Sequence, residues 1–157
     1  MKTDLTPGSP APDFTAPVTG GSHKPGDTMH LASLKGTTVV LYFYPKDDTP
    51  GCTKQACALR DGWSRISEKA TVFGVSIDSV KRHEKFIKKY SLPFALIADE
   101  DKAIVNAYGV WVEKSLYGRK YMGTERTTFV IAPDGTIKAV LPKVKPDEHL
   151  EQVLEVL

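Results

Sequence analysis

The chain has 157 residues, a formal net charge of +2, 41% hydrophobic residues and 25% charged residues. This length suits one domain with a buried core, and we expect one domain over residues 1–157. The small charge and the scattered basic residues argue against a nucleic-acid-binding function. No segment approaches the roughly 18 apolar residues of a membrane span, and no apolar run resembles a signal peptide. We therefore expect a cytoplasmic protein that is not bound to a membrane.

Residues 1–37 are rich in Pro, Gly, Ser and Thr, with short apolar islands. This composition favours irregular chain with one hairpin rather than a helix. Residues 38–44 then form a run of β-branched, apolar and aromatic residues that ends at Pro45. Continuous apolar strands of this kind are usually buried on both faces, as in a parallel sheet. We therefore predict a central strand immediately before Pro45.

The segment Pro45–Gly51 is rich in turn-forming residues, and a helical pattern begins directly after it. Apolar residues then recur three and four positions apart, which predicts one helix with a buried stripe. The stripe consists of Cys52, Ala56, Leu59, Trp63 and Ile66.

The rest of the chain alternates between strands and helices before it ends in a hairpin and a last helix. Residues 127–131 and 137–141 are apolar runs around Asp134–Gly135, the pattern of an antiparallel hairpin. The whole order predicts an α/β fold with a central mixed β-sheet flanked by helices. The other predicted elements are a strand at 71–77, a helix through 80–90, a strand at 94–98, a helix at about 100–108 and a helix through 150–157.

Cys52 directly follows Thr49-Pro50-Gly51, within the first turn of the predicted helix. The thiolate is the reactive form of cysteine, and a free thiol with a pKa of about 8.5 is only about 3% ionised at pH 7. Unpaired backbone N–H groups and the positive end of the helix dipole favour the anion at this position. Cys52 is therefore a candidate nucleophile. The alternative is a small hydrophobic residue on the buried stripe.

Cys57, the other cysteine, lies five residues further along the same helix. Five helical residues rise about 7.5 Å and turn about 140°, which separates the two Cα atoms by about 8.6 Å. A disulfide requires a Cα separation below about 7 Å. The pair can therefore join only if the first turns of the helix unwind, which Gly51 and Gly62 would make easier. Without such a change, Cys57 is an inert thiol.

The sequence supports a metal site or a cysteine hydrolase less well than it supports a redox function of the two cysteines. A zinc site needs about four ligands, usually in closely spaced pairs, and no such set is present. The sequence leaves open a histidine base beside the thiol but marks none. We expect no metal or cofactor, and we expect the four histidines to be solvated surface residues. They are His23, His30, His83 and His149.

The segment Pro45-Lys-Asp-Asp-Thr49-Pro-Gly-Cys52 reads P-x-x-x-T-x-x-C and resembles the signature of the peroxiredoxins. With its flanking residues it is similar to the bacterioferritin-comigratory-protein, or peroxiredoxin Q, subfamily. This resemblance implies a thioredoxin-like fold with an N-terminal hairpin extension. It also implies a thiol-dependent peroxidase that reduces hydrogen peroxide and organic hydroperoxides. Further matches over nearly the whole chain include Gly8–Phe14, Leu31–Gly36, Tyr108–Val110 and Tyr121–Phe129.

By this resemblance, Cys52 is the peroxidatic cysteine that becomes a sulfenic acid. Arg126 would hold the thiolate and polarise a peroxide oxygen. Thr49 would direct its hydroxyl toward the reacting oxygens, and Pro45 would shield the site from water. Cys57 would close an intramolecular disulfide, a role inferred by elimination because subfamily members differ in the place of the resolving cysteine. Thioredoxin or a glutaredoxin would then reduce the disulfide, and the chain would act as a monomer.

Residues 20–28 are longer than this subfamily pattern needs, and we interpret them as a surface insertion without function. Two other functions stay open. A thioredoxin-like disulfide oxidoreductase would carry Cys-x-x-Cys and a proline just before the strand at residue 127, and this chain has neither. A redox sensor that passes its disulfide to a partner could use the same two cysteines, and peroxide turnover would separate it from an enzyme.

Overall fold

The computed structural model describes residues 3–157. Its strands are Thr15–Gly20 (β1), His23–His30 (β2), Val39–Phe43 (β3), Thr71–Ser76 (β4), Ala95–Ala98 (β5), Trp111–Leu116 (β6), Arg119–Thr124 (β7), Thr127–Ile131 (β8) and Ile137–Leu141 (β9). Its helices are Leu31–Leu34 (η1, a 3-10 helix), Pro50–Asp61 (α1), Trp63–Ile66 (α2), Val80–Tyr90 (α3), Ala103–Ala107 (α4) and His149–Val156 (α5).

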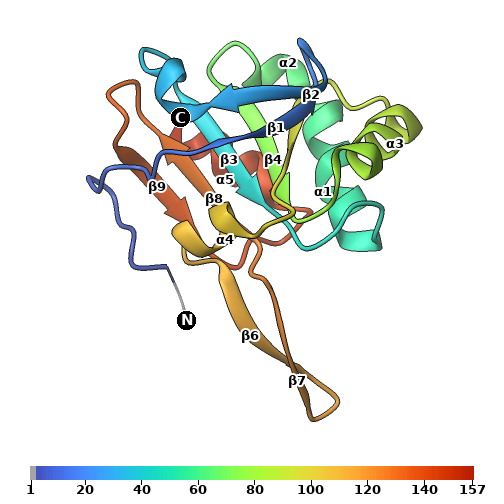
Figure 1. The fold of residues 1–157 in the computed structure, drawn as a ribbon. Coiled ribbons are helices and arrows are strands. Elements are labelled where there is room, and N and C mark those ends of the chain that lie inside the picture. The colour runs from blue at the N-terminus through green and yellow to red at the C-terminus, as the bar shows by residue number, and fades with distance from the viewer. Residues whose placement is uncertain (1–2) are drawn as a thin grey trace.

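One seven-stranded sheet runs through the molecule in the order β2-β1-β5-β4-β3-β8-β9 (Figure 1). Strands β3, β4 and β5 are parallel, whereas β8 pairs antiparallel with β3 and β9 pairs antiparallel with β8. Helices cover both faces of this sheet. The arrangement confirms the predicted thioredoxin-like fold with a central mixed sheet.

Strand β3 lies at the centre of the sheet, and all five of its residues are buried. Its side chains alternate between two hydrophobic cores. Leu41 and Phe43 join the core that also receives helix α4, whereas Val40 and Tyr42 join the core that receives α1, α3 and α5. Burial of each such side chain stabilises the folded protein by about 1.5–3 kcal/mol. Strand β3 is therefore a rigid support for the loop that follows it.

The N-terminal hairpin includes residues 20–28, which were interpreted as a surface insertion. These residues form the turn and most of strand β2, which pairs with β1 from Thr15–His30 to Gly20–His23. Gly20 and Gly21 have φ values of 93° and 59°, and glycine adopts such values without steric cost. Strand β1 in turn pairs with β5, so the hairpin completes one edge of the main sheet.

A second hairpin, formed by β6 and β7, extends away from the main sheet (Figure 1). The sequence pattern predicts no element at residues 111–124. Leu116 pairs with Arg119, so the turn has two residues, Tyr117 and Gly118, with φ values of 51° and 77°. Positive φ at both positions is the geometry of a type I′ turn. The hairpin carries the exposed large hydrophobic residues Leu116, Tyr117, Tyr121 and Met122.

The long helix predicted from the stripe through Cys52 and Ile66 is divided into α1 and α2 at Gly62. A Cβ atom at Gly62 would overlap Cδ2 of Leu150, on helix α5. A side chain at residue 62 would therefore force the Leu150 side chain to move.

Candidate active site

The candidate site lies where strand β3 ends and helix α1 begins. Thr49 is the residue that caps α1, with extended backbone angles of φ −99° and ψ 156°. Pro50 follows in the first turn, where a missing N–H removes no helical hydrogen bond. Cys52 therefore lies in the first turn of α1, as predicted, and is 2% exposed.

A buried hydrogen-bond network holds the loop between β3 and α1. The carboxylate of Asp47 contacts the hydroxyl of Tyr44 and, at 2.6 Å, Nδ1 of His83. The backbone N–H of Asp47 donates to Asp78 at 2.8 Å. On its other side, His83 donates from Nε2 to the carbonyl of Ile97 at 2.9 Å. The network ties this loop to α3 and β5, and so fixes the chain that leads to Cys52.

Arg126 is the charged group beside the thiol. It lies between β7 and β8, and its Nη2 donates to Sγ of Cys52 at 3.4 Å. Its backbone carbonyl accepts from the N–H of Val144 at 2.8 Å, which fixes the segment that carries it. A guanidinium at hydrogen-bond distance stabilises a thiolate relative to a thiol, because it is permanently charged and only donates.

A hydrogen-bonded chain of side chains continues from Arg126 into the protein. Its Nη1 donates to Oε1 of Gln55 at 2.6 Å. The Gln55 amide nitrogen lies 3.0 Å from Nδ1 of His149, and Nε2 of His149 lies 2.7 Å from the hydroxyl of Thr128. Gln55, Thr128 and His149 are all fully buried. Sequence reasoning missed this set of residues.

The expectation that all four histidines are surface residues is wrong for His83 and His149, which are both 0% exposed. Burial and the nearby charge of Arg126 lower the pKa of His149 from 6.5 to about 3. A signal was present in the sequence, because His149 stands four residues before Val153 on the apolar stripe of the last helix. A histidine on a buried stripe needs hydrogen-bond partners, and here it has two.

Cys57 is half-buried on the same helix as Cys52, and both cysteines are free thiols. Helix α1 is continuous from Pro50 to Asp61. The two Cα atoms are therefore separated by about 8.6 Å, as regular helical geometry requires. A disulfide between them needs the first turns of α1 to unwind.

Thr49 and Pro45 lie on the loop that precedes the thiol. The hydroxyl of Thr49 donates to the carbonyl of Lys46 at 2.9 Å, so its oxygen lone pairs are free to accept a further hydrogen bond. Pro45 directly follows the buried Tyr44 and is half-buried. Thr49 thus stands directly at the start of α1, whereas Pro45 lines a separate hollow beside Asp78, and Cys52 and Arg126 are in direct contact.

A hollow of about 560 Å³ opens beside Arg126, lined also by Lys114 and Lys143 and by Val112 and Val144. Burial and Arg126 lower the pKa of Lys114, while Cys52 and Glu125 act in the opposite direction.

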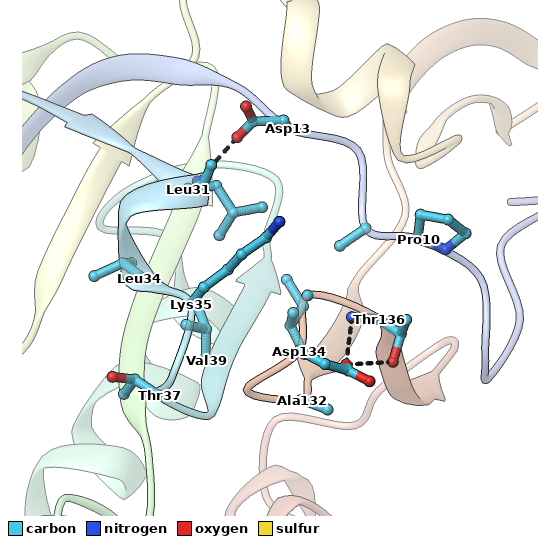
Figure 2. Close-up of a pocket in the computed structure, with 14 residues that line it drawn as sticks. Pro10, Asp13, Leu31, Leu34, Lys35, Thr37, Val39, Ala132, Asp134 and Thr136 are labelled. Carbon is cyan, nitrogen blue, oxygen red and sulfur yellow. Dashed lines mark hydrogen bonds between the residues drawn. The ribbon is translucent and has the colours of Figure 1, made fainter.

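A separate cavity of about 350 Å³ lies at the opposite end of the sheet, beside Val39 and Ile131 (Figure 2). Val39 begins strand β3, whereas Cys52 follows the other end of that strand. Lys35 extends across this cavity, and Asp134 is bonded to Thr136. The cavity is separated from the thiol by the length of β3, so it does not form part of the candidate site.

Within residues 3–157, no group of three or more His, Cys, Asp or Glu side chains is placed to hold a metal ion. No helix in the same part of the chain is long and apolar enough to cross a membrane.

Comparison with known proteins adds relatives that match over almost the whole chain. Residues 7–140 match the AhpC/TSA family. The chain is 51% identical over 148 residues to the putative peroxiredoxin Bcp of Coxiella burnetii, covering 94% of this chain and 95% of the relative. It is 42% identical over 151 residues to peroxiredoxin Bcp of Bacillus subtilis, covering 96% of this chain and 93% of the relative.

Solved structures show the same likeness. The bacterioferritin comigratory protein of Xanthomonas campestris, studied for its alkyl peroxide reduction, superposes with a TM-score of 0.84 at 33% identity. The match covers 98% of this chain and 96% of that one. Peroxidoxin BcpB of Mycobacterium tuberculosis gives a TM-score of 0.82 at 32% identity, covering 97% of this chain and 96% of that one.

Proposed function

The chain belongs to the AhpC/TSA family and is a peroxiredoxin of the Bcp, or peroxiredoxin Q, type, and on this premise we propose that Cys52 is its peroxidatic cysteine. The observation that carries this assignment is the 3.4 Å contact between Nη2 of Arg126 and Sγ of Cys52. Among residues 3–157, the sulfur of Cys57 makes no hydrogen bond to a cationic side chain.

In the first step, the Cys52 thiolate attacks one peroxide oxygen as the O–O bond breaks. The sulfur loses two electrons and becomes a sulfenic acid, and the other oxygen leaves with a proton from solvent as water or an alcohol. Negative charge moves from sulfur to the leaving oxygen during this step. Arg126 stands beside the sulfur at the start and can donate to the oxygens as the charge moves, which lowers the barrier.

Thr49 and Pro45 complete the proposed peroxide pocket. The Thr49 hydroxyl donates to the Lys46 carbonyl, so its lone pairs can accept the O–H of the peroxide. Pro45 covers the site without adding an N–H that would compete for the reacting oxygens. Alkyl hydroperoxides fit the proposal, because the mostly charged hollow beside Arg126 also includes the apolar side chains of Val112 and Val144.

In the second step, Cys57 resolves the sulfenic acid. The first turns of α1 unwind, the Cys57 thiolate attacks the sulfur of Cys52, an S–S bond forms and the S–O bond breaks; the leaving hydroxide takes a proton from solvent and becomes water. A dithiol protein, thioredoxin or a glutaredoxin, then restores both thiols by exchange. All of these steps occur within one chain, which supports a monomer. The need for a dithiol reductant supports a cytoplasmic location.

The proposal is tested with Cys57→Ser, which keeps the peroxidatic sulfur and removes the resolving one. We expect one rapid oxidation by hydrogen peroxide, then a sulfenic or sulfinic acid on Cys52 and no disulfide. Normal cycling of this variant with thioredoxin would remove the resolving role from Cys57. Cys52→Ser is the matched control, and peroxide turnover by that variant would contradict the central assignment.

A further inference from the structure

The bonds around Gln55 fix the orientation of its side-chain amide. An arginine side chain only donates hydrogen bonds, so the atom of Gln55 that lies 2.6 Å from Nη1 of Arg126 is the carbonyl oxygen. The amide nitrogen of Gln55 then faces Nδ1 of His149 at 3.0 Å. Because an amide nitrogen only donates, Nδ1 of His149 carries no proton and accepts this bond.

This assignment also fixes the tautomer of His149. The neutral ring carries its one proton on Nε2, which donates to the Thr128 hydroxyl at 2.7 Å. A protonated ring would carry a proton on Nδ1, which would face the N–H of the Gln55 amide. It would also add a second positive charge close to Arg126. The low pKa of His149, about 3, agrees with a ring that stays neutral in the folded protein.

The three residues behind Arg126 come from three elements, with Gln55 on α1, Thr128 on β8 and His149 at the start of α5. One guanidinium nitrogen binds Gln55 and the other binds Cys52. Since the guanidinium is planar and rigid, restraining Nη1 also restrains the direction in which Nη2 points. His149 is 0% exposed and, among residues 3–157, makes no direct hydrogen bond to Cys52, so it is linked to the thiol only through Gln55 and Arg126.

We propose that His149 is a positioning residue for the peroxidase reaction, which acts as a neutral hydrogen-bond acceptor that orients Gln55 and, through it, Arg126. The inference rests on the proposed roles of Cys52 and Arg126. The ring takes no part in proton transfer to the peroxide. Its contribution is the alignment of the arginine before the O–O bond breaks.

Two substitutions of His149 separate its two hydrogen bonds. Asparagine in His149→Asn can place its carbonyl oxygen close to the position of Nδ1, and so keeps an acceptor for Gln55. Glutamine in His149→Gln reaches toward Thr128 and loses that acceptor. We expect the second-order rate constant with hydrogen peroxide to stay within about threefold of wild type in His149→Asn and to fall about tenfold or more in His149→Gln.

The control reaction is alkylation by iodoacetamide at a pH where Cys52 is fully ionised, because alkylation breaks no O–O bond and does not need an aligned arginine. We expect equal alkylation rates in wild type, His149→Asn and His149→Gln, with thermal unfolding midpoints measured alongside. Equal peroxide rates in all three proteins, or a parallel loss of both reactions, would overturn the proposal. Cys52→Ser in the same peroxide assay tests the proposed function separately: if it still consumes peroxide, the function fails, whatever His149 does.

The tautomer tests the hydrogen-bond directions on which the proposal rests. Nitrogen NMR of the folded protein at pH 7 should show the His149 ring protonated at Nε2 only. Thr128→Val removes the acceptor for that proton at almost constant volume. We expect Nε2 to keep its proton in this variant, because the Gln55 amide still faces Nδ1, and the peroxide rate to fall because the ring loses its second restraint. A ring protonated at Nδ1 in the wild-type protein would contradict the proposal.

Discussion

Gly51 and Arg126 approach each other so closely that a Cβ atom at position 51 would lie 3.2 Å from Nη2 of the arginine. This is the same nitrogen that donates to Sγ of Cys52. The absence of a side chain at residue 51 therefore lets the guanidinium reach the thiol over the first turn of α1. Gly51 thus leaves room for the Arg126 guanidinium in addition to forming part of the first turn of α1.

Gly51→Ala should slow the reaction with peroxide by about threefold to tenfold, because the guanidinium must shift by a few tenths of an ångström. Helix α1 should persist, since alanine favours a helix more than glycine does. Rapid-mixing kinetics measure the rate, and circular dichroism checks the helix. A faster or unchanged rate would show that Arg126 tolerates the methyl group without loss.

Arg126→Ala should lower the rate constant for peroxide by about a hundredfold or more, the usual effect of removing a donor that stabilises charge in the transition state. Arg119→Ala provides a matched control, because Arg119 is an exposed arginine on strand β7. We expect wild-type kinetics from that control. A similar rate in both variants would exclude Arg126 from the reaction.

Gly62→Ala should destabilise the protein by about 1–3 kcal/mol, because its methyl group would overlap the side chain of Leu150. Urea unfolding of the single variants and of the double variant Gly62→Ala with Leu150→Ala measures the coupling. We expect the second substitution to relieve part of the cost of the first. Additive effects would mean that the two helices separate freely at this point.

His149 should make stability depend on pH. Its pKa is about 3 in the folded protein against 6.5 in the unfolded chain, so the unfolded chain binds more protons between these values. Stability therefore falls as pH falls through this window, by about 2 kcal/mol between pH 7 and pH 5. His149→Asn lacks this titration, and its unfolding free energy should fall less over the same range. Parallel curves for the two proteins would contradict the low pKa.

The sequence was sufficient to predict the strands of the main sheet from β3 onward, because each of them carries a local signal, whereas β1 and β2 were expected only as one hairpin in irregular chain. Residues 38–44 are continuously apolar, and Asp134–Gly135 marks a tight hairpin. Hairpin β6–β7 was missed because Lys114, Arg119 and Lys120 interrupt the apolar pattern of a strand that faces solvent. Its Tyr117–Gly118 turn was the signal that could have indicated it.

At the site, the sequence motif identified Cys52 and Arg126 as candidates, and the structure places them in contact. Gln55 and His149 could not be paired from sequence, because 94 positions separate them and their contact depends on how α5 packs against α1. Tertiary packing brings such polar pairs together, so they leave no pattern in the local sequence. A polar residue on an apolar helical stripe nevertheless indicates that a hydrogen-bond partner lies elsewhere in the chain.

The most direct test of the central claim adds one equivalent of hydrogen peroxide to the fully reduced protein and records free thiols and intact mass. We expect rapid loss of both thiols from a monomer whose mass falls by only two hydrogens, because Cys52 is oxidised and Cys57 closes the disulfide. Unchanged thiols would contradict the attack by Cys52. Added oxygen with Cys57 still free would contradict the unwinding of α1 and the resolving role of Cys57.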